Sequence, residues 1–265
     1  MRKVELPSKR NIGILAAIQF LLTISFLFFP LMHSPFSRTI TVAFSLFGLS
    51  DLQESNILQD LLFIVFRLPL LLFGAGYLRS RFSSSEAMIL TRQISMRLYF
   101  FKNIRRLCMM SLCDFAAIVI ALGIFLSPDL CNGVGPQDIG WLRQMMPLII
   151  FYPLSGFVIL LYINLFTLVT PRKMNSLIGL GALLCNIVLF RIPSAFLQSW
   201  IPYTPIAAQS FNYIGTQTHA DFVSASVDAD IYLHGNALLL FVSLLVQAII
   251  LTMIISKVLR KVDYV

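Results

Sequence analysis

Charged residues are scarce in this chain. Asp, Glu, Lys and Arg make up 12% of its 265 residues, whereas hydrophobic residues make up 58%. A soluble domain usually carries about 25% charged residues, so this composition excludes an ordinary soluble protein. The mean hydropathy is +0.84, and several apolar runs reach the ~20 residues needed to cross a hydrocarbon core. The chain is therefore expected to be a polytopic helical membrane protein.

Motifs of catalysis and cofactor binding are also missing. The sequence contains no G-x-x-x-x-G-K-[ST], so it cannot cradle ATP phosphates itself, and it has neither H-E-x-x-H nor G-x-S-x-G. The separations of His33, His219 and His234 fit no compact metal motif. We therefore expect no enzyme activity, no catalytic residue, no metal and no cofactor in this chain.

Cysteines are few and do not form a disulfide framework. Three of the four lie in or next to apolar runs, and only Cys131 falls in a loop. A cleavable leader is not expected either. The first apolar run is too long for a signal-peptide core and has no small-residue cleavage site, so it is interpreted as a retained span.

The apolar runs predict six membrane-spanning helices in a single transmembrane domain over residues 1–265. They lie at about 12–32, 57–78, 107–126, 144–169, 174–199 and 236–258. Two outer loops, 33–56 and 200–235, are long. The second begins WIPYTPIAAQSFNYIG, an apolar and Pro-broken stretch that either dips into the membrane and returns or lies on its surface.

The basic residues predict the orientation of these spans. Most of the 20 Lys and Arg residues fall in the amino-terminal segment, the loop after the second run, the TPRKMN turn and the tail. Most acidic residues fall on the opposite side. The positive-inside rule then places both termini in the cytoplasm of a multi-pass cell-membrane protein, and an even number of spans agrees with this.

A basic and aromatic segment, TRQISMRLYFFKNIRRL, precedes the third run. Just upstream, Ser83 and Glu86 have the spacing of a capping box, which begins a helix. An apolar stripe then recurs at spacings of three or four, through Ala87, Leu90, Ile94, Leu98 and Phe101. These patterns predict an interfacial helix over about 83–106 that ends or bends near Phe100 to Asn103, followed by an elbow at Arg105 and Arg106.

Three interpretations of this segment compete. It could anchor the chain to anionic lipid, dock a cytoplasmic partner, or bind nucleic acid. The last is disfavoured because the segment is held against the bilayer. The capped helix favours docking, since electrostatic anchoring needs no defined helix.

The arrangement resembles the membrane subunit of a bacterial ABC exporter of the six-span ABC-2 type. In that family the loop between spans 2 and 3 carries a coupling helix that sits on the ATP-binding subunit, and the large outer loop between spans 5 and 6 dips back into the membrane. Here SSSEAMILTRQISMRLYFFKNIRRL and WIPYTPIAAQSFNYIG occupy these two positions. The outer loop 33–56 is longer than the family's minimum.

The resemblance implies an all-α permease subunit that exports an amphipathic peptide, an antibiotic or a lipid-like molecule. It implies a separate ATP-binding cassette subunit, which would hold ATP and Mg, and a second membrane subunit, identical or different. The lipid bilayer is the other expected partner, and nucleic acid is not. The residues expected to couple the chain to the ATPase are Ser83, Glu86, Arg92, Arg97, Phe101 and Lys102.

Charged and Pro residues inside the spans are candidates for the translocation pathway. Arg67 lies near the bilayer middle, where a charge costs several kcal/mol unless it is paired or faces water, and Pro69 follows it. Arg67 either faces the pathway or pairs with Asp60 or with an acid on a neighbouring span. The other pathway or gate candidates are Arg191, Pro193 and Tyr203.

Further polar residues inside the spans are assigned structural roles. Asp114, near the inner end of the third run, is expected to pair with Arg105 or Arg106. Asn164 and Asn186 are expected to join helices by hydrogen bonds more often than to bind ligands.

The alternative function is a non-transporting membrane immunity or assembly protein that binds a peptide at its outer loops. In that case residues 200–235 would carry the function, and residues 83–106 would be only an anchor. A membrane enzyme is a third alternative, against which the missing catalytic motifs count.

Overall fold

The computed structural model describes residues 9–28, 57–82, 96–131, 148–170, 181, 204–205 and 237–261. The regular structure of these residues is helical. The helices are α1 (Lys9–Phe28), α3 (Ile57–Gly74), α5 (Met96–Cys131), α7 (Leu148–Val169) and α12 (Ala237–Lys261), and a short helix over 77–82 follows α3. The all-helical prediction is therefore confirmed for this part of the chain.

Three of the helices are long and apolar enough to cross a membrane. The candidate spans are Met96–Phe125 in α5, Ile149–Val169 in α7 and Leu238–Leu259 in α12, each of which contains an apolar window, and α1 contains a shorter apolar helix, Asn11–Ser25. The predicted span 174–199 lies outside the described residues except for residue 181. The two long outer loops also lie outside them, apart from 204–205. The six-span order thus stays a prediction.

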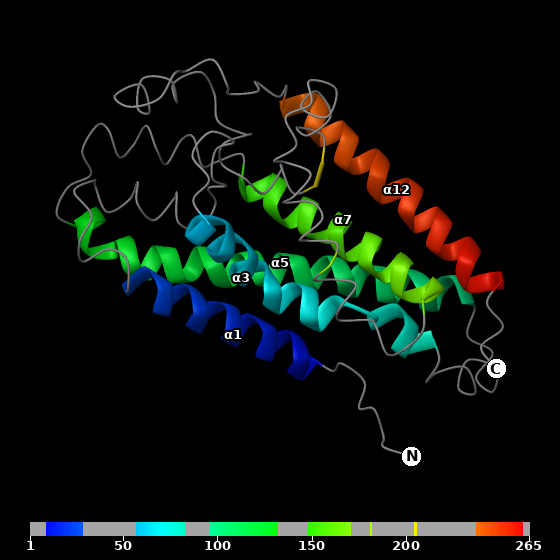
Figure 1. Ribbon diagram of the computed structural model, residues 1–265, viewed down its shortest axis with the longest axis horizontal. Helices are drawn as coiled ribbons and strands as arrows, with labels where there is room; N and C mark the ends of the chain where they lie inside the picture. The colour runs from blue at the N-terminus through cyan, green and yellow to red at the C-terminus, as the bar shows by residue number, and fades with distance from the viewer. Residues whose placement is uncertain are drawn as a thin grey trace.

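The helices form an elongated bundle in which most lie lengthwise side by side (Figure 1). Helix α1 packs against α5 and α3, α5 packs against α7, and α7 packs against α12. Helices α1 and α5 run in one direction, and α3, α7 and α12 run in the other. In the predicted order of spans, the fourth and the sixth run in the same direction, as α7 and α12 do.

The bundle has a buried core and an apolar outside. Side chains such as Leu107, Leu160 and Leu244 are completely buried. Large apolar side chains are also exposed along α5 and α12, for example Met109, Leu112, Val119, Ile249 and Met253. Soluble monomers rarely expose contiguous apolar surfaces of this kind, so the outer face suits a lipid environment.

The basic segment before the third apolar run belongs to α5. The sequence predicted a bend near Phe100 to Asn103 and an elbow at Arg105 and Arg106, and this prediction is wrong, because α5 is one helix from Met96 to Cys131. No Gly or Pro interrupts the chain between Met96 and Leu122, so the backbone ladder continues past the charges. Its 36 residues extend about 54 Å, well beyond a hydrocarbon core of ~30 Å.

Candidate functional site

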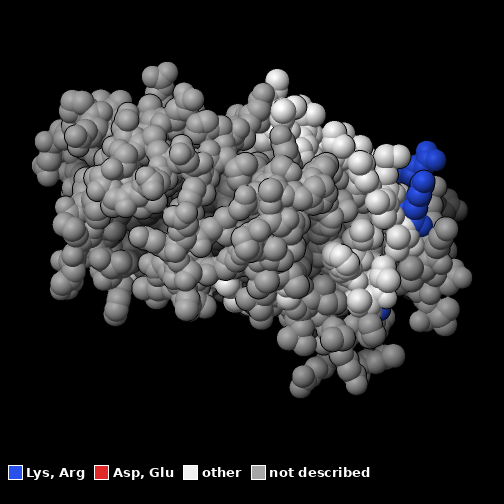
Figure 2. Space-filling model, turned by 45° about the horizontal axis from the view of Figure 1, so that its top comes forward, with Lys and Arg blue, Asp and Glu red and all other residues white. Residues whose placement is uncertain are grey.

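Basic residues gather at one end of the bundle. The helix over 77–82, the start of α5 and the ends of α7 and α12 lie together there (Figure 1). Figure 2 shows Lys and Arg side chains at one edge of the molecule and no Asp or Glu among the described residues of that face. Apart from Arg67 and from Lys9 and Arg10 in α1, the described basic residues belong to these helix ends: Arg79, Arg81, Arg97, Lys102, Arg105, Arg106, Lys257, Arg260 and Lys261. We call this region the basic end.

The short helix 77–82 is fastened to the first turns of α5. The rings of Phe82 and Tyr99 meet edge to face, with centroids 5.3 Å apart. The Tyr77 hydroxyl donates a hydrogen bond of 3.1 Å to Asn103 Oδ1, and Asn103 Nδ2 donates one of 2.9 Å to the Tyr99 carbonyl. These four residues are called the aromatic clamp. They hold the end of 77–82 beside the start of α5.

Arg79 joins the same short helix to the end of α7. Its Nη1 donates to the carbonyl of Thr167 over 2.7 Å and also to the carbonyl of Thr170. The last carbonyls of a helix have no partner within the helix, and a cation there also interacts favourably with the helix dipole. Helix 77–82 is therefore held by both α5 and α7.

The helix is interrupted between α3 and 77–82, and the side chain of Asn164 in α7 bonds to the backbone on both sides of this break. Gly76 has φ 69°, the left-handed conformation that commonly ends a helix and that glycine adopts most easily. The Asn164 side chain accepts from the Leu78 amide over 2.9 Å and donates to the Gly74 and Leu160 carbonyls over 2.9 and 2.8 Å. The prediction that Asn164 joins helices is confirmed.

Arg67 lies inside the bundle, with only 2% of its surface exposed. Its guanidinium lies over the ring of Tyr152 in α7, 5.4 Å from the centroid, and its charge interacts with that of Asp114 in α5. Asp114 is fully buried, and neither carboxylate oxygen accepts a hydrogen bond within the described part of the chain. The acid whose charge acts on Arg67 thus lies on a neighbouring helix.

The expected pairing of Asp114 with Arg105 or Arg106 is wrong. In an unbroken helix, residues eight or nine positions apart are separated by about 12–14 Å along the axis, beyond the reach of an ion pair. Arg105 is exposed at the surface, whereas the charge that acts on Asp114 is that of Arg67. The predicted elbow at Arg105 and Arg106 is also absent, because α5 is continuous there.

Pro69 lies buried within α3, two residues after Arg67. It has no backbone N–H to donate to the preceding turn. In that turn, the Phe66 carbonyl accepts a hydrogen bond of 2.9 Å from Nε2 of Gln19 in α1, a fully buried side chain. The polar interior of the bundle is thus built by four helices. Nothing in the local sequence around Gln19 indicated this role.

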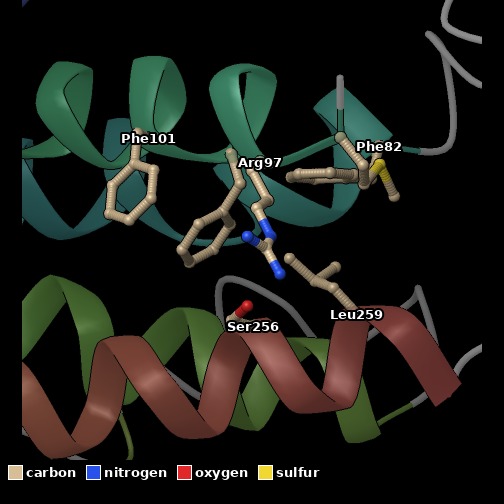
Figure 3. A pocket seen from close by; sticks show the side chains of 7 residues that line it. Phe82, Arg97, Phe101, Ser256 and Leu259 are labelled. Atoms are coloured by element: carbon tan, nitrogen blue, oxygen red, sulfur yellow. The ribbon is translucent and has the colours of Figure 1, made fainter. Parts of the chain in front are cut away.

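A groove opens at the basic end between α5 and α12. It has a volume of about 700 Å³ and is lined by Phe82, Met96, Arg97, Phe100, Phe101, Ser256 and Leu259. The Arg97 side chain extends from α5 across the groove toward Ser256 of α12 (Figure 3). The sequence offered no signal for this groove, because its two walls, near residues 96–101 and 256–259, are far apart in the sequence.

The structure brings together only some of the predicted site residues. Arg97 and Phe101 share the groove, and Lys102 is exposed on α5. Arg67 and Pro69 lie in the interior of the bundle, apart from that group. The remaining candidates lie outside the described residues: Ser83, Glu86, Arg92, Arg191, Pro193 and Tyr203.

The described residues include no group of three or more His, Cys, Asp or Glu side chains that could hold a metal ion. Comparison of the whole chain with protein-family models, with curated proteins and with solved structures finds no match. Function is therefore inferred from the geometry of the basic end and from the predicted order of spans.

Proposed function

We propose that this protein is the membrane subunit of an ATP-driven transporter and that a separate ATPase subunit docks at the basic end. One observation carries the proposal. The segment 83–95, expected to begin the coupling helix, connects helix 77–82 to α5. These two helices are held together, since Phe82 and Tyr99 are in ring contact. A partner that displaces this segment would therefore move both neighbouring helices at once.

The described helices suit the transmission of such a movement. Helix α5 continues without interruption from the basic end through the apolar window to Phe125. Helix 77–82 is tied to α7 by Arg79 and joined to α3 through the break at Gly74–Gly76. A push at the basic end would tilt α5 and α7 as rigid bodies and bend the chain at the break, and this movement would alternate access.

The orientation and the remaining partners follow from the same proposal. The positive-inside rule would place the basic end in the cytoplasm, where ATP is available. Exposed apolar side chains on α12, such as Val246 and Ile250, offer surface for lipid or for a second membrane subunit. The proposed cargo is an amphipathic peptide, an antibiotic or a lipid-like molecule, and the direction of export rests on the family resemblance alone.

The proposal is tested with the full chain and candidate ATP-binding subunits. Co-purification should yield a complex, and Glu86→Ala with Arg92→Ala should weaken it. Phe82→Ala and Tyr99→Ala should leave the complex intact but reduce the effect of the membrane subunit on ATP hydrolysis, because the clamp transmits the movement.

Phe166→Ala removes an equally large, exposed aromatic side chain from α7 and serves as the control. If no ATPase associates, or if none of the substitutions alters coupled hydrolysis, the transporter proposal fails.

A further inference from the structure

The groove between α5 and α12 combines apolar walls with two polar groups. Its walls are formed by Phe82, Phe100, Phe101 and Leu259, and its polar groups are the Arg97 guanidinium and the Ser256 hydroxyl. A volume of about 700 Å³ lies within the range of pockets that hold small molecules, about 300–1,000 Å³. The groove can therefore take a ligand that has both an apolar and a polar part.

The charge in the groove is positive and has no acidic counterpart nearby in the described chain. Helix α12 has no Asp or Glu from Ala237 to Lys261, and the first acid of α5 is Asp114, far from the groove along the helix. Within the described residues, no hydrogen bond or ion pair of Arg97 is found. The polar part of a complementary ligand is thus an anion.

The groove lies among the basic residues of the bundle, at the end of its exposed apolar surface. On α5, the groove residues Met96 to Phe101 precede the exposed Lys102 and Arg105, and the exposed apolar Met109 follows one turn later. Along α12, the exposed Met253 and Ile254 are followed by Lys257, next to Ser256 of the groove. In a bilayer this level is the one where lipid phosphates lie, with acyl chains on its apolar side.

We infer that the groove binds an anionic phospholipid of the surrounding bilayer. The Arg97 guanidinium would donate to the phosphate, for which its planar fork is well suited, and the Ser256 hydroxyl would donate a second bond. One acyl chain would lie against the aromatic walls. This inference goes beyond the proposed function and does not rest on it, since a membrane protein of any function could bind lipid here.

Lipid titration of the purified full chain tests the inference. After the protein has been stripped of native lipid in detergent, phosphatidylglycerol and phosphatidylcholine are titrated separately, and bound lipid is counted by native mass spectrometry. One phosphatidylglycerol should bind about tenfold more tightly than phosphatidylcholine, because both lipids carry a phosphate but the choline cation offsets its charge beside Arg97. Equal binding of the two lipids would overturn the inference.

Matched variants locate the site. Arg97→Gln should weaken phosphatidylglycerol binding about tenfold, whereas Arg105→Gln, on the same helix but outside the groove, should not change it. Ser256→Phe should also weaken binding, because it fills the groove and leaves every charge in place. Equal losses for Arg97→Gln and Arg105→Gln would indicate unspecific attraction and overturn the inference.

Two further measurements separate a lipid from other anions. Soluble glycerol phosphate should not displace the lipid, and displacement would indicate a free phosphate compound instead. A photo-crosslinking residue at position 259 should capture phosphatidylglycerol in vesicles made of it and phosphatidylcholine. Capture of a protein segment in place of lipid would overturn the inference.

Discussion

The side-chain amide of Asn164 donates a hydrogen bond of 2.9 Å to the carbonyl of Gly74, across 90 positions of sequence. The same side chain accepts from the Leu78 amide on the other side of the helix break. Irregular backbone at membrane depth is tolerated only where protein or water satisfies its polar groups. One residue of α7 therefore makes the break between α3 and 77–82 possible.

Asn164→Leu is expected to destabilise the protein by about 2–4 kcal/mol, because two buried backbone groups lose their partner. The measurement is unfolding of the purified protein in detergent. Thr170→Val is a suitable control, since its hydroxyl donates only to the Phe166 carbonyl within the same helix. Its effect should stay within about 0.5 kcal/mol. Equal stability of the Asn164 variant and the parent would show that the bridge is dispensable.

Gly74→Ala is expected to destabilise the protein by about 1–3 kcal/mol, the usual cost of overpacking a core. A methyl group on Gly74 would overlap the Leu160 side chain, which is completely buried and must move. Leu160→Ala alone leaves a cavity and costs about 2–5 kcal/mol.

The two changes should be less harmful together than the sum of their separate effects, as a double-mutant cycle measures. Gly123→Ala is the matched control, because no atom of the described residues lies near the added methyl group in α5. Its effect should be neutral or slightly stabilising. Strict additivity at positions 74 and 160 would contradict the contact.

The interaction of Arg67 with Asp114 is expected to appear as strong coupling. Asp114→Leu leaves the buried guanidinium without its acid and should cost about 3–5 kcal/mol, and Arg67→Met should cost a similar amount. The double variant should recover most of this loss, because apolar residues replace both charges. Unfolding measurements on the four proteins give the coupling free energy. Additive losses would mean that the two charges act independently.

The sequence predicted the helices that the apolar runs determine directly. Crossing a hydrocarbon core needs a minimum length of apolar residues, and the apolar windows in α5, α7 and α12 fall where those runs lie. The sequence did not predict where α5 begins, because hydropathy falls at Arg97, Lys102 and Arg105. The backbone hydrogen bonds of the helix nevertheless continue through these residues. A helix can continue beyond the bilayer, and composition alone does not reveal this.

The candidate site was predicted less well, for a different reason. Clustering of Lys and Arg at one end could be predicted, since it reflects the cost of placing charges in lipid. Contacts between helices could not be predicted from the sequence. Asp114 was assigned a partner from the preceding basic segment, Arg105 or Arg106, yet its charge interacts with Arg67 of α3. Ser256 and Arg97 share a groove that no local spacing connects.

Loss of the Arg79 contacts at the end of α7 should loosen helix 77–82 selectively. Arg79→Gln removes a cation that donates to the Thr167 and Thr170 carbonyls and should cost about 1.5–3 kcal/mol, the range for hydrogen bonds to charged groups. Local opening then becomes easier, so the amides of 77–82 should exchange with deuterium faster than in the parent, while those in the middle of α5 keep their protection.

Arg79→Lys should have an intermediate effect, because it retains the charge but not the planar guanidinium. Arg105→Gln, at an exposed position of α5, should have none. Unchanged exchange of 77–82 in Arg79→Gln would mean that the aromatic clamp alone holds the short helix in place.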